Sequence, residues 1–205
     1  MANVNGSYRQ AILETTRFFG AEVTLAEISA AKRQPGSNND WELTRALLAA
    51  REIQVSLAAV TARFQDLYNQ FSHTEKLIPS LDLLRRLAAY LPLAIVTGRP
   101  RLEAEQFLSR TGCGEFFTTM ICLEDAPEKP DPAPIELALQ KLDVESAWMF
   151  GDTINDILAA RRARVLPLGV VPPGESPGDN STCLIAAGAG RVFTDLSALQ
   201  EVLPI

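Results

Sequence analysis

The sequence predicts an α/β fold in which an all-helical module precedes an open parallel sheet. Up to about Phe71, apolar residues recur at helical spacing and strand signals are almost absent. From Pro79 onward, short apolar strands alternate with helices, which is typical of a parallel sheet covered by helices on both faces. We therefore expect a helical domain over residues 5–75 and an α/β domain over residues 76–205.

Four helices are expected in the helical module. Ile12 and Phe19 belong to an apolar stripe on the first, and the turn-rich sequence QPGSNND separates the second from the third. The expected helices are Tyr8–Phe19, Leu25–Arg33, Trp41–Arg51 and Ser56–Phe71.

Five strands are expected in the α/β domain, at Leu93–Thr97, Thr119–Leu123, Ala147–Phe150, Leu166–Val170 and Arg191–Phe193. The helices around them are Leu81–Tyr90, Arg101–Arg110, Pro134–Lys141, Ile154–Arg162, one before the last strand, and Ser197–Val202. The segment Val171–Ser181, rich in Pro, Gly and Ser, is expected to be a surface loop. Because ligands of such folds bind beyond the carboxyl ends of the strands, chemistry is expected there.

The composition excludes several classes of protein. Of 205 residues, 19 are Lys or Arg and 25 are Asp or Glu, giving a formal charge of −6, whereas a nucleic-acid binder needs a basic face. Apolar runs fall far short of the roughly 20 residues of a membrane span, and the first ten residues carry no secretory signal pattern. Three cysteines without a CxxC pair indicate reduced thiols. We expect a cytoplasmic protein with no nucleic-acid or membrane partner.

The first candidate site follows the strand that ends in AIVTGRP. Thr97 and Gly98 come directly after the last apolar residue, and a hydroxyl followed by a glycine amide at the start of a helix can hold a phosphate oxygen. A strand–helix turn in which glycine only supplies the geometry explains the same residues.

The second candidate site is the sequence GDTINDILAA. Asp152 ends a strand and Asp156 lies four residues on, in the first turn of a helix, so the two carboxylates could serve Mg²⁺ together with waters and a substrate phosphate. Helix capping by an acid or threonine explains the same pattern.

The third candidate is Lys129, in the proline-rich loop APEKPDPAP after another strand. A lysine there can neutralise a phosphate dianion or a nucleophilic carboxylate. By itself it is better explained as a solvated loop residue beside Glu128 and Asp131.

These three motifs follow strands in one order: Thr-Gly, a Lys-Pro loop, then Gly-Asp-x-x-x-Asp. The ordered set resembles the haloacid dehalogenase-like hydrolase superfamily, mostly Mg²⁺-dependent phosphatases, over essentially the whole chain. The resemblance implies a three-layer Rossmann-like sheet and a helical cap of the subfamily I type. It also implies that Thr97 and Gly98 grip a phosphoryl group, that Lys129 offsets its charge, and that Asp152 and Asp156 help to bind Mg²⁺.

The N-terminal module carries a finer resemblance. VNGSYRQAI and SNNDWELT are similar to a subgroup whose chains read DxDGV-x-x-V-x-G-S-Y-R near the start. We expect the loop Gly36–Trp41 to contact substrate through Asn39, Asp40 and Trp41. Asn39 and Glu42 are also spaced to cap a helix, which needs no substrate.

The family's first motif, a strand that ends in Asp-x-Asp, is absent from this sequence. The resemblance implies that its first Asp attacks phosphorus, that its second acts as acid and base, and that its strand is the centre of the sheet. Without that strand two edges would be unpaired, at roughly 1–3 kcal/mol for each unmet backbone group. We expect a start codon assigned too late, with roughly ten further residues before Met1.

Two functions remain at this point. One is a Mg²⁺-dependent phosphomonoester hydrolase acting on a small phosphorylated metabolite, with Lys129 as the catalytic residue that the chain itself contains. The other is a non-catalytic remnant that binds phosphate or a partner without turnover. Dehalogenation is disfavoured because Gly-Asp-x-x-x-Asp implies a metal that this reaction does not need.

Overall fold

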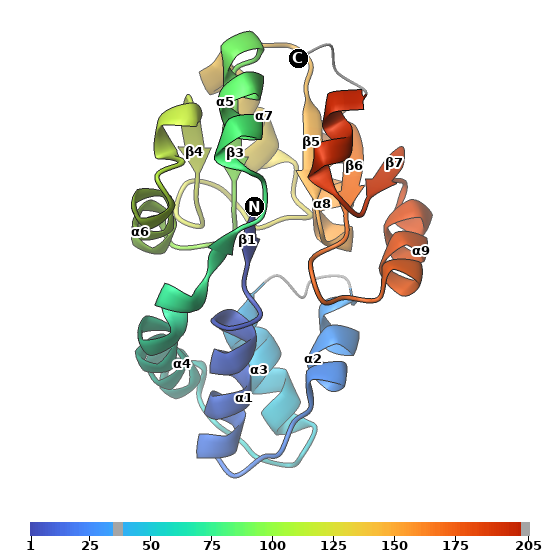
Figure 1. Cartoon of the computed structure of the whole chain (residues 1–205). Helices are drawn as coiled ribbons and strands as arrows, with labels where there is room; N and C mark the ends of the chain where they lie inside the picture. The colour runs from blue at the N-terminus through green and yellow to red at the C-terminus, as the bar shows by residue number, and fades with distance from the viewer. Residues whose placement is uncertain (35–38, 202–205) are drawn as a thin grey trace. The chain divides into compact units, whose positions relative to one another are not determined.

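A computed structural model describes residues 1–34 and 39–201 of the chain. Its internal contacts divide the chain into two compact units, Met1–Lys76 and Leu77–Ile205. Figure 1 shows both units, and each is described by itself below.

The first unit is helical, as the sequence predicts. Its helices are α1 (Tyr8–Phe18), α2 (Leu25–Lys32), α3 (Asp40–Ala49) and α4 (Leu57–Phe71), followed by the 3₁₀ turn η1 (Ser72–Thr74). Helix α1 packs against α3 and α4 around a buried core that includes Ile12, Phe64 and Tyr68. The side chains of Thr24, Asn39 and Ser56 cap the starts of α2, α3 and α4.

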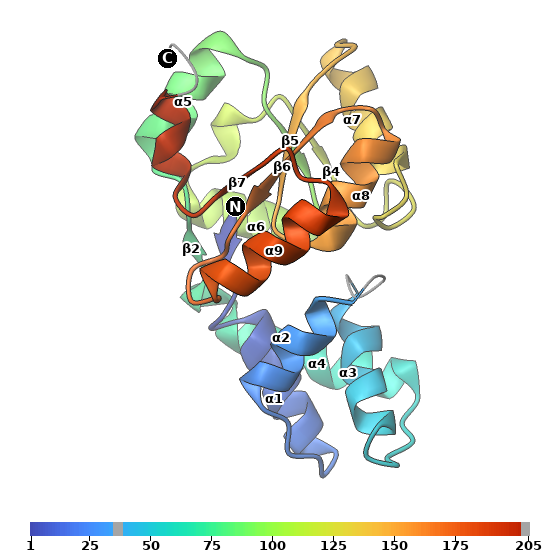
Figure 2. The same cartoon turned by 90° about the vertical axis from the view of Figure 1, so that its right-hand side faces the viewer.

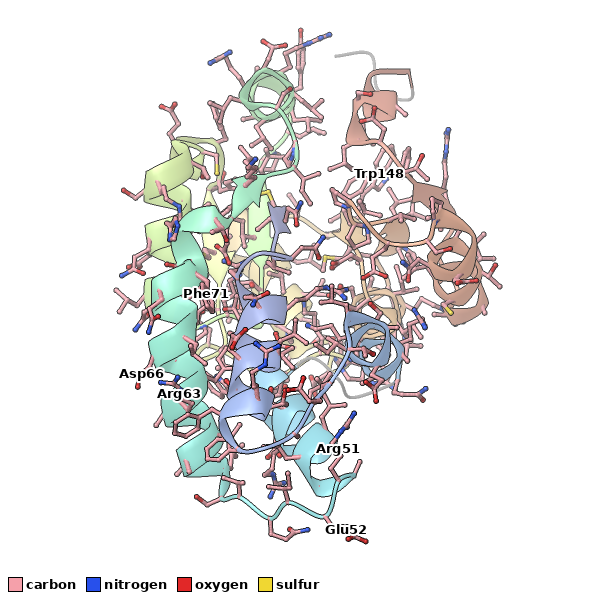
Figure 3. All side chains as sticks on the ribbon, turned by 60° about the horizontal axis from the view of Figure 1, so that its bottom comes forward. Arg51, Glu52, Arg63, Asp66, Phe71 and Trp148 are labelled. Atoms are coloured by element: carbon pink, nitrogen blue, oxygen red, sulfur yellow. The ribbon has the colours of Figure 1, made fainter. Side chains whose placement is uncertain are left out.

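Side-chain contacts hold the helices of this unit together near its surface. Arg51, which follows α3 and is labelled in Figure 3, donates to the Glu27 carboxylate at 2.6 Å. The guanidinium of Arg63 on α4 lies over the Phe18 ring, 4.4 Å from its centroid. Two short strands that the sequence analysis did not expect, β1 (Ala2–Asn3) and β2 (Lys76–Leu77), pair with each other.

The second unit contains the predicted parallel strands. β3 (Ala94–Val96) pairs in parallel with β4 (Thr119–Ile121). β5 (Trp148–Gly151), β6 (Leu166–Val170) and β7 (Arg191–Phe193) form a second parallel sheet in that order. The helices are α5 (Leu81–Tyr90), α6 (Arg101–Thr111), α7 (Ala133–Leu142), α8 (Ile154–Arg162) and α9 (Pro177–Ala187), with the 3₁₀ turns η2 (Gly114–Phe116) and η3 (Leu196–Glu201).

Helices lie on both faces of these strands. In Figures 1 and 2, α7 and α8 lie on one face, and α5 and η3 lie on the other. Buried residues of α7 and α8, among them Ile135 and Ala159, pack with Val96 of β3 and Met149 of β5. One expectation is wrong: the segment Val171–Ser181 is a loop only in its first part. Helix α9 begins at Pro177, because the fixed backbone angle of proline suits the first turn of a helix.

β3 and β5 each end a sheet within the described residues. The two strands belong to separate sheets, and Figure 1 shows them as neighbours in the order β4, β3, β5, β6, β7. All three residues of β3 are apolar yet only half-buried. At the start of β5, Trp148 is 43% exposed (Figure 3), as is Leu166 beside it, at 44%. Central strands of a parallel sheet are usually buried on both faces, so the side chains of these two strands are less covered than is usual. Separately, each strand has one edge without a partner strand among the described residues.

Candidate active site

The backbone that follows β3 is fixed by hydrogen bonds to the β4 segment. The Thr97 amide donates to the Ile121 carbonyl at 2.9 Å, and the Leu123 amide donates to the Arg99 carbonyl at 3.0 Å, so pairing with the β4 segment continues past the strand. The Thr97 hydroxyl accepts from the Arg99 amide at 3.2 Å. Residues 97–99 thus form the strand–helix turn that the sequence analysis gave as the alternative explanation of Thr97 and Gly98.

Within the described residues, neither the Thr97 hydroxyl proton nor the Gly98 amide donates to a protein acceptor. Gly98 is exposed, and a Cβ placed on it would meet no atom within 4 Å. Two hydrogen-bond donors without a protein acceptor among the described residues thus lie at the carboxyl end of a parallel strand, where oxyanions commonly bind.

Lys129 lies next to these donors. Its ammonium group donates to the Val96 carbonyl at 3.2 Å, which places the charge beside the residue that precedes Thr97. It also contacts the Asp156 carboxylate at 2.6 Å. The Lys129 side chain is only 10% exposed, so the solvated-loop alternative is wrong.

Asp156 is buried and its two oxygens are both engaged. Oδ1 accepts from Lys129, and Oδ2 accepts from the Thr153 amide at 3.1 Å and the Thr153 hydroxyl at 2.8 Å. Thr153 in turn caps α8 by accepting from the Asp156 amide. Burial opposes ionisation, but the Lys129 charge and these hydrogen bonds hold the pKa of Asp156 below its ordinary value.

Gly151 allows this arrangement. A Cβ at this position would lie 2.1 Å from the Asp156 Cβ, so a larger residue would displace the carboxylate. Asp152 follows Gly151 directly and is exposed at the end of β5. The structure thus brings the ends of β3 and β5 together with Lys129, from three separate parts of the sequence.

The described residues contain no group of three or more His, Cys, Asp or Glu side chains that could hold a metal ion. Asp152 offers an exposed carboxylate, which suits Mg²⁺, because this ion commonly takes one or two protein carboxylates, waters and substrate oxygens. Asp156, with both oxygens in hydrogen bonds, holds Lys129 in this structure. Its predicted role as a metal ligand stays a prediction.

The three predicted substrate residues of the first unit all have structural contacts. Asn39 accepts from the amides of Trp41 and Glu42 as a helix cap. Asp40 pairs with Lys32 at 2.7 Å, and Trp41 packs against the core. Gly36 and its neighbours (35–38) lie outside the described residues. Contact of this loop with substrate stays a prediction.

Two further residues support the site. Thr153 positions Asp156, and the threonine cap that the sequence offered as the alternative for this motif is confirmed. Sequence reasoning missed the second residue. Arg162, at the end of α8, donates to the Pro130 carbonyl at 2.7 Å and so ties the Lys129 loop to the helix that carries Asp156. Nothing in the local sequence indicates that contact, because 32 positions separate the two residues.

Comparison with known proteins establishes the family. A sequence model described as haloacid dehalogenase-like hydrolase matches residues 4–170. The chain belongs to this family. Phosphoglycolate phosphatase from Vibrio cholerae is 32% identical over 82% of the chain and 77% of its own length. The resemblance inferred from the three motifs is thereby confirmed.

A further relative from Phytophthora nicotianae is 40% identical over the whole chain and bears the name imidazoleglycerol-phosphate dehydratase. Pyrophosphatase PpaX from Bacillus velezensis is 36% identical over 51% of the chain. The chain spans about half the length of each of these two relatives.

Solved structures share the fold of this hydrolase chain. A putative β-phosphoglucomutase from Thermotoga maritima has a TM-score of 0.70 and 26% identity, over 96% of this chain and 92% of that one. A predicted phosphoglycolate phosphatase from Haemophilus somnus has a TM-score of 0.81 at 18% identity, over 98% and 92%. The mixed α/β fold with a helical N-terminal region is therefore that of the family. Among the described residues, none of the helices has the length and apolar character that crossing a membrane requires.

Proposed function

We propose that this protein is a Mg²⁺-dependent phosphomonoester hydrolase that acts on a small phosphorylated metabolite. The observation that carries the proposal is a pair of donors without a protein acceptor among the described residues, the Thr97 hydroxyl and the Gly98 amide, beside the part-buried Lys129 ammonium. Phosphoryl transfer depends mainly on positioning and charge stabilisation. Donors fixed on the backbone of β3 provide both without reorganisation.

In this proposal each polar group of the site has a separate task. Thr97 and Gly98 bind phosphoryl oxygens, and Lys129 stabilises their negative charge. Asp156 keeps Lys129 in place through the 2.6 Å contact. Asp152 is the residue of the chain best placed to hold Mg²⁺, which when bound supplies positive charge beside the phosphoryl group.

The nucleophile is proposed to lie on a strand that precedes Met1 and pairs with both β3 and β5. Two observations support this: among the described residues, β3 and β5 each have one edge without a partner strand, and no Asp-x-Asp occurs in the sequence. Such a strand would complete a three-layer Rossmann-like core over residues 76–205, with residues 5–75 as the helical cap. An aspartate at its carboxyl end would reach the phosphoryl group held by Thr97 and Gly98.

The names of the relatives suggest which phosphate compounds to test first. One name concerns a phosphomonoester, phosphoglycolate, and another concerns a phosphoanhydride, pyrophosphate. The name of the Phytophthora relative concerns imidazoleglycerol phosphate, and half of that protein lies outside the match. When a hydrolase region is joined to a second region in one chain, we expect the two regions to act on related substrates. Imidazole-bearing phosphomonoesters are therefore included in the panel of compounds to test.

The absence of Asp-x-Asp favours a second function, phosphate binding without turnover. Both proposals are tested by release of inorganic phosphate from p-nitrophenyl phosphate and from the panel, with Mg²⁺. The 205-residue chain is compared with a chain that includes the upstream in-frame codons. We expect turnover only in the longer chain, and its loss in Thr97→Val. No turnover in either chain, with phosphate still bound, would support the second function.

A further inference from the structure

Helix α6 begins without a cap of its own. Its first residue is Arg101, and the residue before it, Pro100, has no side-chain acceptor for the amides of the first turn. This start matters because the Thr97–Gly98 donors lie only three residues upstream. An unsatisfied helix start would leave the short connection between them loosely held.

The missing cap comes from another part of the chain. Both carboxylate oxygens of Glu124, in the loop after β4, accept from the Arg101 amide, at 3.0 and 3.1 Å. A carboxylate at a helix N-terminus is favoured by the hydrogen bond and by the helix dipole. The anion position at the start of α6 is therefore taken by the protein itself.

Asp125 completes the connection through the Arg101 side chain. Its Oδ2 accepts from the Arg101 guanidinium at 2.5 Å and from the Cys122 amide at 2.7 Å. The Cys122 hydrogen bond and the Arg101 charge hold the pKa of Asp125 below its ordinary value, so it is ionised at neutral pH. The loop after β4 thus holds both the backbone and the side chain of Arg101.

We infer that Glu124 and Asp125 are positioning residues for the phosphate-binding turn, acting through Arg101. The inference rests on the proposed function. The turn is fixed at its strand side by Thr97 and Arg99, which pair with the β4 segment. It is fixed at its helix side by the two acids, which hold Arg101, so the turn that contains the Gly98 amide is anchored on both sides. Donors held in that way stabilise an anion without reorganisation.

Hydrogen exchange of the amides at 97–102 tests the inference directly in the 205-residue chain. We expect Glu124→Ala to lower protection in this segment about tenfold and to leave α8 unchanged. Glu124→Gln keeps an acceptor and should restore part of that protection. Glu105→Gln is the matched control, because it removes one acid from the same helix, where Glu105 approaches only the Arg101 side chain, at 4.0 Å.

Affinity for inorganic phosphate, measured by calorimetry with Mg²⁺, gives the functional readout. We expect the Kd to rise about fivefold in Glu124→Ala and to stay unchanged in Glu105→Gln. Equal exchange at 97–102 in Glu124→Ala and wild type would overturn the inference and leave the proposed function standing. Faster exchange with an unchanged phosphate Kd would also overturn it. If wild type binds no phosphate, the proposed function fails, and the exchange result alone decides whether Glu124 holds the turn.

Discussion

The contact between Lys129 and Asp156 leads to a prediction about the free energy of unfolding. At 2.6 Å and an effective dielectric constant of about 20, the attraction is about 6 kcal/mol, part of which offsets the cost of burying both charges. Asp156→Asn keeps an acceptor but removes the carboxylate charge that contacts the Lys129 ammonium at 2.6 Å. Because the two side chains are only 10% and 7% exposed, we expect a loss of about 3–5 kcal/mol in the free energy of unfolding at pH 7.

Urea unfolding followed by tryptophan fluorescence measures this loss. The two tryptophans lie in different units, so a Trp41→Phe background leaves Trp148 to report the unit that contains the pair. Asp82→Asn is the matched control. Asp82 forms an exposed pair with Arg85 at 3.5 Å, so its loss should cost under about 0.5 kcal/mol.

The stability that the Lys129–Asp156 pair contributes should fall as the pH is lowered. Folding lowers the pKa of Asp156, so the pair stabilises the protein above the unfolded pKa of about 4. That stability is lost as pH falls through the folded pKa. The gap between wild type and Asp156→Asn should therefore be constant above about pH 5 and shrink below it. A loss under 1 kcal/mol at pH 7, or a gap that widens with acid, would refute the reasoning.

Four further predictions concern glycine positions, backbone strain, a buried hydrogen bond and phosphate binding. Gly151→Ala should cost about 1–3 kcal/mol, since its Cβ would lie 2.1 Å from a buried side chain, while Gly98→Ala, with no atom within 4 Å, should leave the denaturation midpoint unchanged. Arg164→Gly should raise stability by up to about 1 kcal/mol in urea unfolding, because this residue has φ of 59°. Ser7→Ala removes the 2.7 Å hydrogen bond to buried Glu75 and should cost about 1–3 kcal/mol, read from Trp41 fluorescence. Calorimetry should show phosphate binding with Mg²⁺ and almost none in EDTA.

The sequence predicted strand ends better than it predicted contacts. Thr97, Gly98 and Asp152 were placed correctly at the ends of β3 and β5, because alternating apolar strands and helices locate those ends without tertiary information. Lys129 was assigned from motif order, yet its contacts with Val96 and Asp156 lie 33 and 27 positions away. Local spacing carries no information at such separations.

The long sequence separation also explains why the sequence did not predict that Glu124 caps α6. It caps a helix that begins 23 positions earlier, whereas capping patterns are recognised only within one turn of the same helix. The two short strands β1 and β2 were missed for another reason. Each has two residues, too few to show any alternation, and their pairing links positions far apart in the chain.

Charge balance explains why the proposed reaction needs a cation besides Lys129. Lys129 and Asp156 form a neutral pair, and Asp152 adds a negative charge at the neighbouring strand end. The whole chain carries a formal charge of −6, so its long-range field does not favour a phosphate dianion. The attraction must then come from directed donors at Thr97 and Gly98 and from a divalent ion beside Asp152. Without that ion, a dianion at these donors would face the neutral Lys129–Asp156 pair and the repulsion of the Asp152 carboxylate.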